Sequence, residues 1–479
     1  MKRSIQHVFQ EVRRRNHLRY FPLRENLRGY SLDTASGDLR AGLNVALLAF
    51  PQGMAYAAIA GMPIQYGIYG SAIAALLGPL LAGSRFIILG PTNATSVLIF
   101  ASFLSMGITD AATKASLLPL IVFLSGAFLI LGAFLKVANL IQYISRSVVT
   151  GYITAAALYI IINQLAKVLG YSLELPQGST VLTVLYLTLA EIGATHWPTL
   201  LVSLMTFGIF QLLSRTFGKL PNVAITLVIM SAVAAGLNQL LLANGWAGPV
   251  GTLNAVDPSQ WQFSLPPFRG DLISQLSSVA LVVAFLSVLE GTSIGKSLAS
   301  RAGQKLDSNQ EMLGMGLANI GCALYQGMPA SGSLTRSQLN WNSGAKTPLA
   351  SMIAGLLCAI GAYTVGPFTH YIPTSVLAVL VITIGLSLIN RHVLRIVWNA
   401  TGSDRLVFLV TFLSAFFIRL DFAIVLGTGV SVLLFLRKAA QPELTEYAPD
   451  QEGQMKPLEK KEKKGEAEIS IVHVEGDLF

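Results

Sequence analysis

The chain has 479 residues, of which 53% are hydrophobic and only 12% are charged, and its formal net charge is +9. A soluble protein carries roughly twice that charged fraction, so the composition excludes an ordinary soluble domain. The apolar runs are about twenty residues long, which favours membrane-spanning helices over the ten-residue alternating strands of a membrane β-barrel.

The basic residues are unevenly distributed along the chain. Arg and Lys cluster in the first forty residues and in the tail, whereas the long polar loops at 170–190 and 241–268, which are expected to lie outside, contain neither. This asymmetry follows the positive-inside rule and does not indicate a nucleic-acid partner. We therefore expect a multi-pass protein of the inner (plasma) membrane with both termini in the cytoplasm. Lys114 is a mild exception to the pattern.

A polar N-terminal arm (1–36) precedes two sets of apolar segments, expected to form transmembrane repeats over 37–243 and 272–438 around an external loop at 244–271. The expected segments are 38–60, 63–83, 91–106, 114–135, 141–168, 193–213 and 219–243, then 272–297, 310–327, 332–342, 347–367, 373–395, 403–419 and 421–437. An odd number of segments per half requires the halves to insert in opposite orientations, as in an inverted repeat. The predicted fold is an all-α polytopic membrane protein with fourteen segments in two inverted seven-helix repeats.

The tail is polar and differs from the rest of the chain. Residues 439–466 are charged and are expected to be a linker, whereas 467–479 alternates like a β-strand. A single strand is not stable by itself. We therefore expect 467–479 to begin a second, soluble domain in which this sequence ends.

The third segment of each half begins after a break that contains proline. In the first half, Gly90 and Pro91 lead into Thr92, Asn93 and Ala94. Thr92 or Asn93 can cap a helix, and Pro91 suits the first turn. An ordinary loop and helix start would also explain this stretch, although the matching break in the second half favours a half-helix inside the membrane.

In the second half, Arg336 follows Pro329 and a run of small residues. Hydroxyl groups and glycine allow a ligand close to the backbone, and Arg336 is expected in the first turn of a second half-helix. A cation at membrane depth is costly and is rarely present without a function. A snorkelling arginine at the membrane boundary is the alternative. The small residues of the predicted site are Ala330, Ser331, Gly332 and Ser333.

Three further polar residues complete the predicted site. Glu290 lies deep in its apolar segment and is expected to balance Arg336, to take up a coupling proton or sodium ion, or to be purely structural. Gln52 and Tyr56 are four residues apart and share one helix face, next to Pro51. Gln52 is expected to line a cavity, and Tyr56 to line the same cavity or to pack.

No enzyme motif appears in the sequence. The six histidines are scattered, and neither a paired metal motif nor a phosphate-binding loop is present. Cys322 and Cys358 lie in apolar segments and imply no disulfide. We expect no catalytic residue, no metal and no cofactor.

Several motifs together resemble the sulfate permease (SulP) family, known in animals as solute carrier family 26. The motifs are Pro51-Gln-Gly-Met-Ala-Tyr-Ala57, Gly90-Pro-Thr92, Asn309-Gln-Glu-Met-Leu-Gly-Met-Gly-Leu-Ala-Asn319 and Met328-Pro-Ala-Ser-Gly-Ser-Leu-Thr-Arg-Ser337. The resemblance implies the seven-plus-seven fold of the uracil permease, with a core domain that moves against a gate domain. It also implies a substrate site between half-helices 3 and 10, a C-terminal STAS domain that is truncated here, and a homodimer in the full-length form.

The expected function is secondary active transport of a small anion by elevator-like alternating access, as proton or sodium symport or as exchange. Sulfate, bicarbonate, chloride and dicarboxylates all suit two positive helix ends and Arg336. A sodium-dependent bicarbonate importer is a second candidate. The members of the family with that function usually carry an aspartate at the position of Glu290, within a different motif, and this difference disfavours the second candidate. A nucleobase permease of the same fold and an anion channel also remain open as candidates.

Overall fold

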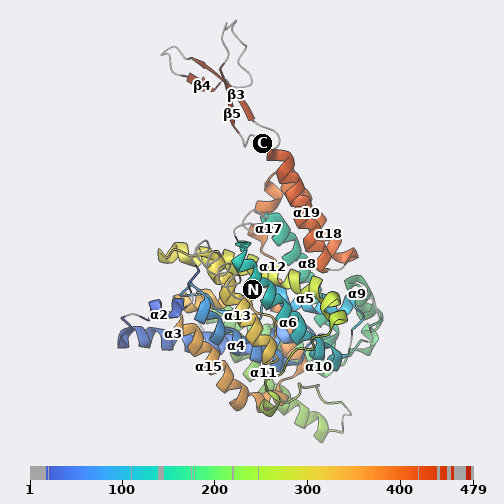
Figure 1. Ribbon diagram of the computed structural model, residues 1–479. Coiled ribbons are helices and arrows are strands. Elements are labelled where there is room, and N and C mark those ends of the chain that lie inside the picture. Colours follow the sequence, from blue (N-terminus) through green and yellow to red (C-terminus); the bar gives the residue numbers. More distant parts are fainter. Residues whose placement is uncertain are drawn as a thin grey trace.

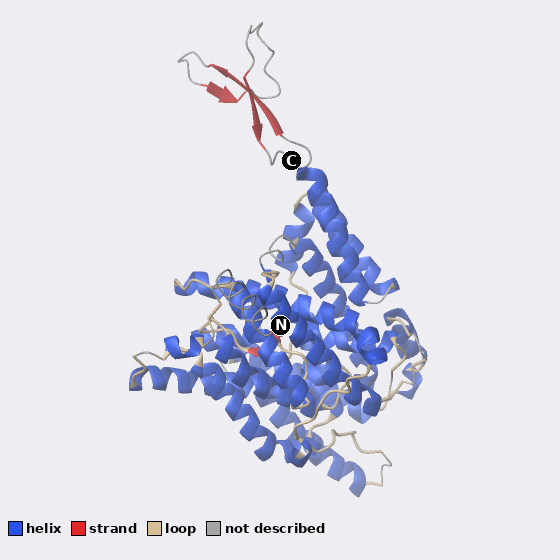
Figure 2. Ribbon diagram, in the orientation of Figure 1, coloured by secondary structure: helices blue, strands red, loops and turns tan. Residues whose placement is uncertain are grey.

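The computed structural model describes residues 18–19, 21–27, 29–108, 110–138, 145–173, 175–176, 179–217, 221–245, 248–418, 420–439, 443–449, 455–457 and 471–475. Helices dominate this part of the chain (Figure 2). The helices of the first half are α2 (Pro22–Asn26), α3 (Leu32–Ile59), α4 (Ile64–Leu81), α5 (Asn93–Ser105), α6 (Ala111–Phe134), α8 (Arg146–Leu169), α9 (Val181–Ala190), α10 (Trp197–Thr216) and α11 (Asn222–Ala243).

Short 3-10 turns at Ile192–Ala194, Pro258–Gln260 and Gly366–Tyr371 connect some of the elements. The helices of the second half are α12 (Gly270–Ala302), α13 (Ser308–Leu324), α14 (Leu334–Asn342), α15 (Leu349–Thr364), α16 (Thr374–Leu388), α17 (Arg391–Asn399), α18 (Gly402–Phe417) and α19 (Leu420–Ala439). Each of the fourteen predicted segments overlaps one of these helices.

Local sequence explains where several helices begin. Ser31 caps α3 by accepting a hydrogen bond from the Thr34 amide, and Asp110 caps α6 in the same way. Such caps satisfy amide groups that have no partner within the helix. Gly170 ends α8 in the left-handed conformation that glycine adopts without strain.

The helices pack into two groups, which Figure 1 shows side by side. In one group α13 packs against α4 and α6, α15 packs against α3 and α4, and α12 packs against α6. In the other group α8 packs against α16 and α18, and α18 packs against α19. Smaller interfaces, such as α3 with α16 and α5 with α8, join the two groups.

Glycines allow the closest helix contact in the first group. A Cβ atom at Gly67 of α4 would lie only 1.8 Å from the Gly53 carbonyl oxygen of α3. Small residues let helices approach backbone to backbone, which is how they pack tightly inside a membrane. This contact holds the part of α3 that carries Gln52 and Tyr56 firmly against α4.

Two short strands join the halves of the chain. β1 (Leu89–Gly90) pairs antiparallel with β2 (Ser331–Gly332), so that Leu89 faces Gly332 and Gly90 faces Ser331. Each strand immediately precedes a short helix, α5 or α14. The pairing therefore brings the two predicted breaks together, although they are more than two hundred residues apart in sequence.

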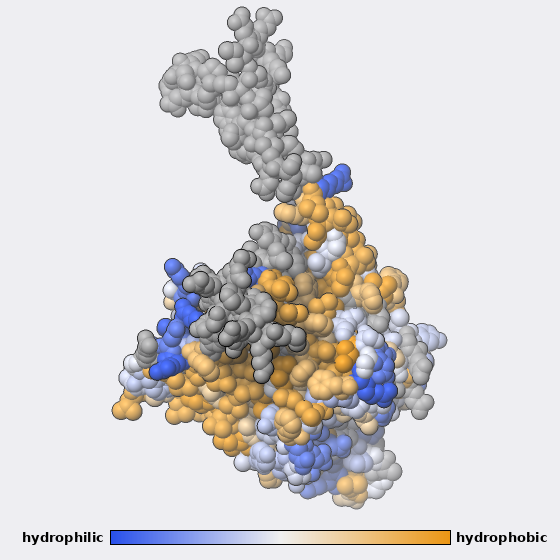
Figure 3. All heavy atoms as spheres, viewed as in Figure 1, coloured by the Kyte–Doolittle hydropathy of each residue, from blue (hydrophilic) through white to orange (hydrophobic). Residues whose placement is uncertain are grey.

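The outer surface is strongly apolar, as Figure 3 shows for the visible face of the helical body. Large hydrophobic side chains such as Leu204, Leu212 and Phe417 are exposed. Among the described residues, eight helices are long and apolar enough to cross a membrane. This supports a multi-pass membrane protein, whereas the count of fourteen segments stays a prediction.

The structure differs from the sequence predictions at several boundaries. α3 begins at Leu32, inside the predicted arm, and α9 lies in a stretch predicted to be an external loop. The Ser31 cap begins α3 within polar sequence, whereas α9 forms from a mostly apolar run.

The tail also differs from its prediction. β3 (Glu443–Pro449) and β4 (Met455–Pro457) lie within the expected linker, and β3 pairs with both β4 and β5 (Ile471–Glu475). β5 is thus the third strand of this sheet in chain order, not the first. The sheet projects beyond the end of α19 (Figure 1). The other residues of 439–479 that the predictions cover lie outside the described part.

Candidate functional site

The first break ends in a fully formed helix cap. Thr92 is the N-cap of α5: its hydroxyl accepts a hydrogen bond from the Thr95 amide, and the Thr95 hydroxyl accepts one from the Thr92 amide. Of the two predicted caps, Thr92 is therefore correct. Pro91 immediately precedes the cap and therefore lies outside the helix, not in its first turn as predicted.

The helix after the second break begins without a side-chain cap. Ser333 is the N-cap of α14, but its side chain makes no capping hydrogen bond. Its backbone amide donates to the Ile88 carbonyl at 3.0 Å, so the backbone at Ser333 is fixed while its hydroxyl is not used for capping. The first turn of α14 consequently keeps amide groups that side-chain capping would otherwise satisfy.

Arg336 lies in the first turn of α14, as predicted, and is completely buried. Its Nη2 donates to the Pro91 carbonyl at 2.6 Å, so the guanidinium group reaches across to the first break. A Cβ atom at Gly90 would be 2.7 Å from Nη1, which shows how closely the guanidinium lies on the β1 backbone. Nε and Nη1 have no hydrogen-bond acceptor among the described residues.

Arg336 is therefore a buried cation with two unused donors beside two helix N-termini. The positive ends of α5 and α14 add partial positive charge to that of the guanidinium. Unpaired buried donors are costly, which favours a bound acceptor that satisfies them. The arrangement suits a small anion.

Polar residues further along α14 fix the crossing of the two breaks. The Ser337 hydroxyl accepts a hydrogen bond from the Ile88 amide at 2.9 Å, and Asn340 Nδ2 donates to the Phe86 carbonyl at 3.2 Å. Both side chains are completely buried. The sequence prediction assigns them no role, although they lie four and seven positions after Ser333, a helical spacing that places polar residues on one face.

Glu290 of α12 contacts the first half-helix. The Thr92 hydroxyl donates to Glu290 Oε2 at 3.0 Å, so the carboxylate lies at the N-terminus of α5. Within the described part of the chain, no ion pair joins Glu290 to Arg336. Glu290 thus shares the site with Arg336 without neutralising it directly.

The other predicted residues surround this crossing. The Ser331 hydroxyl contacts the Ser287 carbonyl at 3.4 Å, and the Tyr152 hydroxyl of α8 donates to the Ala94 carbonyl at 3.3 Å. Asn93 lies at the first position of α5, and its side chain accepts a hydrogen bond from the Ala94 amide.

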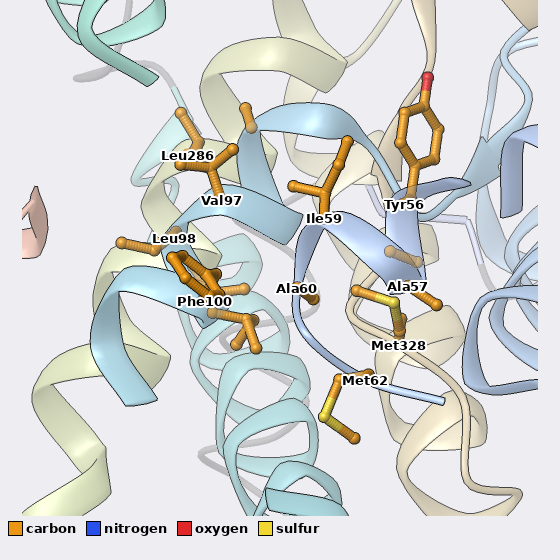
Figure 4. Packing of buried hydrophobic residues seen from close by; sticks show 14 of the residues in the cluster. Tyr56, Ala57, Ile59, Ala60, Met62, Val97, Leu98, Phe100, Leu286 and Met328 are labelled. Atoms are coloured by element: carbon orange, nitrogen blue, oxygen red, sulfur yellow. The ribbon is translucent and has the colours of Figure 1, made fainter. Parts of the chain in front are cut away.

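Gln52 and Tyr56 are both buried on α3. The Gln52 Oε1 atom has no hydrogen-bond donor among the described residues. Tyr56 points away from the Ala60 end of α3 (Figure 4). The structure records no direct hydrogen bond between either residue and the crossed breaks, so their place in the site stays a prediction.

Asn319 of α13 holds the second break in place. Its Nδ2 donates to the Ala330 carbonyl at 2.9 Å, and its Oδ1 accepts from the Ala330 amide at 2.9 Å. Nδ2 also donates to the Met315 carbonyl at 2.8 Å, and the side chain is completely buried. The amide thus replaces the backbone partner that an extended segment lacks.

We expect Asn319→Leu to lower anion uptake strongly while the protein still inserts into the membrane. The substitution leaves the amide and carbonyl of Ala330 unpaired in a buried place, which costs about 1–3 kcal/mol for each group. Initial uptake rates in proteoliposomes, together with thermal melting in detergent, would measure both effects. Asn244→Leu, at the exposed end of α11, is the matched control; uptake by Asn319→Leu equal to that of this control would contradict a positioning role.

No group of three or more His, Cys, Asp or Glu side chains suited to a metal ion occurs within the described residues. Cys322 and Cys358 are free thiols in buried positions.

Comparison with known proteins identifies the family. A model of the sulfate permease family matches residues 36–411, and the chain belongs to this family. It is 27% identical to the chloroplastic sulfate transporter 4.1 of Arabidopsis thaliana over 85% of this chain and 59% of that protein. It is 28% identical to the sodium-independent sulfate anion transporter of Bos taurus over 85% of this chain and 70% of that protein.

Solved structures share the fold. The murine Solute Carrier 26 family member A9 anion transporter in the inward-facing state is 20% identical, with a TM-score of 0.81 over 94% of this chain and 74% of that chain. The transmembrane domain of the cyanobacterial bicarbonate transporter BicA is 21% identical, with a TM-score of 0.69 over 84% of this chain and 98% of that chain. These relatives are transporters, which confirms the prediction that the chain is not an enzyme.

Proposed function

We propose that this sulfate permease family protein is a secondary active transporter that binds a small anion where its two half-helices cross. The observation that carries the proposal is the β1–β2 pairing, which places the N-termini of α5 and α14 next to the buried Arg336. Two helix ends and a guanidinium group with unused donors form a positive site of fixed geometry. The anion is sulfate or a related oxyanion, with bicarbonate, chloride and dicarboxylates as the other candidates.

Each residue of the site has a proposed role. Arg336 Nε and Nη1, the Ser333 hydroxyl, the Asn93 amide at the start of α5 and the first amides of α14 donate to the anion. Ala94, Ala330 and Gly332 leave room for the anion, because their side chains are small or absent. Gln52 and Tyr56 close the site from α3.

Glu290 is proposed to couple anion movement to a proton or a sodium ion. Its carboxylate lies at the N-terminus of α5, where it competes with a bound anion for the same positive charge. Protonation of Glu290, or a sodium ion bound beside it, would remove that repulsion. Anion and coupling ion would then bind together.

We also propose fourteen membrane segments in two inverted repeats, with both termini in the cytoplasm. The half-helices α5 and α14 are each the third segment of a set of seven, and their strands pair antiparallel as a two-fold relation requires. The two packing groups would be the core and gate domains of an elevator-like cycle. The same proposal includes the two repeats with the first beginning at α3, a C-terminal STAS domain beginning at β3, and the homodimer of a longer form.

Uptake into proteoliposomes of labelled sulfate, bicarbonate and fumarate tests this function, with a proton gradient, a sodium gradient or neither. We expect saturable uptake of at least one anion, driven by one of the gradients. Glu290→Gln should abolish gradient-driven accumulation but keep anion exchange, because it removes the titratable charge and keeps the shape. Glu191→Gln, an exposed site on another helix end, is the control.

Three results would replace the proposal with a different function. Bicarbonate uptake driven only by sodium would indicate a sodium-dependent bicarbonate importer. Uptake that uracil or xanthine competes away would indicate a nucleobase permease. Flux far faster than a carrier cycle and independent of any counter-ion would indicate an anion channel.

A further inference from the structure

Two adjacent cavities lie away from the crossed half-helices. Their volumes are about 400 and about 450 Å³, and both are lined by Gly61, Lys167 and Thr374. Neither is lined by Thr92, Ser333 or Arg336, so they are separate from the site proposed above.

Several elements meet around these cavities. The turn between α3 and α4 contributes Gly61, the last turn of α8 contributes Lys167, and the first residue of α16 is Thr374. Phe100 of α5 lies beside this end of α3, and Figure 4 shows it next to Ala60. The cavities thus lie between α3 and α5 of one packing group and α8 and α16 of the other.

Lys167 is a cation without a partner in these cavities. Within the described residues its ammonium group makes neither a hydrogen bond nor an ion pair, and the positive charge of Lys114 is close enough to repel it. A Cβ atom at Gly61 would lie 3.3 Å from the Lys114 ammonium, so Lys114 also lies against the cavity wall. No carboxylate occurs among the described residues that line either cavity.

Buried polar atoms beside Lys167 are also unsatisfied. Gln164, one turn before Lys167 on α8, is only 1% exposed, and both its Nε2 and Oε1 atoms have no partner in the described structure. The Ser375 hydroxyl, at the wall of the second cavity, is 1% exposed and equally unpaired. Ser375 lies in the first turn of α16, whose N-terminus adds partial positive charge.

We propose that these cavities form a second anion-binding site, in which Lys167, Gln164 and Ser375 contact a small inorganic anion. Unpaired buried donors around a free cation are what such an anion satisfies. Lys114 supplies long-range attraction from the rim. This role also explains why Lys114 departs from the positive-inside pattern, since a lysine kept against that rule is expected to have a function.

Equilibrium binding of labelled sulfate and of labelled chloride to the purified chain in detergent tests the proposal. Arg336→Ala should remove one class of sites and leave another. Adding Lys167→Gln to that variant should weaken the remaining binding about tenfold or more, the effect of losing one charged hydrogen bond. Lys167→Arg should keep it, and Arg215→Gln, at the exposed end of α10, is the control. Thermal melting of each variant excludes loss of the fold.

The outcomes separate this site from the crossed half-helices. If the double variant with both Arg336→Ala and Lys167→Gln binds as much anion as Arg336→Ala alone, the second site is wrong. Loss of all binding in Arg336→Ala alone would overturn it too, because a separate site would survive. Unchanged binding in Arg336→Ala, together with complete loss in Lys167→Gln, would support the second site and contradict the central one.

Discussion

Arg336→Ala should reduce anion uptake about a hundredfold or more, because each charged hydrogen bond to the anion is worth about 1.5–3 kcal/mol and two donors are lost. Nε and Nη1 are the donors without a protein acceptor, and Nη2 holds the Pro91 carbonyl. The variant thus removes both the charge of the site and a link between the two breaks. Initial rates of labelled sulfate uptake into proteoliposomes measure the loss.

Arg336→Lys separates these two contributions. A lysine keeps the positive charge but cannot hold the Pro91 carbonyl and two anion oxygens in one planar arrangement. We expect intermediate uptake with a raised half-saturation concentration. Arg395→Ala, an exposed arginine on α17, should transport as the parent protein does. If Arg336→Ala keeps full uptake, Arg336 is only structural and the proposed site is wrong.

Gly332→Ala should also abolish most transport, for a steric reason. A Cβ atom at Gly332 would lie 2.9 Å from the Cα atom of Gly291, so the backbone of β2 or of α12 must move. Forcing an extra methyl group into a packed interior costs about 1–3 kcal/mol. The movement would displace β2 from Leu89 and shift Glu290, the neighbour of Gly291. We expect about a fivefold loss of uptake or more, on the basis of that cost, and a lower melting temperature.

Gly291→Ala is the matched control for Gly332→Ala, since it adds a methyl group to the other side of the same contact. There the nearest atoms are the sulfur and terminal methyl of Met315, at 2.6 and 3.0 Å. A methionine side chain is flexible and gives way more easily than a backbone. Gly291→Ala should therefore lose less uptake than Gly332→Ala. A smaller loss in Gly332→Ala would show that the β2–α12 contact does not position the site.

The sequence predicts those parts of the site in which a residue type strongly restricts the conformation of the backbone or its surroundings. Pro91 and Pro329 mark the two breaks, Thr92 is a capping residue of α5, and Arg336 lies in the first turn of a half-helix. Proline, a capping hydroxyl and a buried cation each restrict the backbone or its surroundings strongly, so they can be read without knowing the fold.

Contacts between distant segments cannot be predicted from periodicity or composition. The pairing of β1 with β2 depends on two residues in each strand, and the clamp of Asn319 on Ala330 spans two elements. Neither has a local pattern. The charged composition of β3 and β4 predicts a linker, whereas the pairing of β3 with both β4 and β5 determines their structure.

The most direct test of the central claim is to locate a bound anion by diffraction from crystals grown with selenate, whose selenium scatters anomalously. We expect an anomalous peak between the N-termini of α5 and α14, within hydrogen-bonding distance of Arg336 and Ser333. A second peak beside Lys167 would agree with the further site. A peak beside Lys167 with none at the crossed half-helices would contradict the central claim.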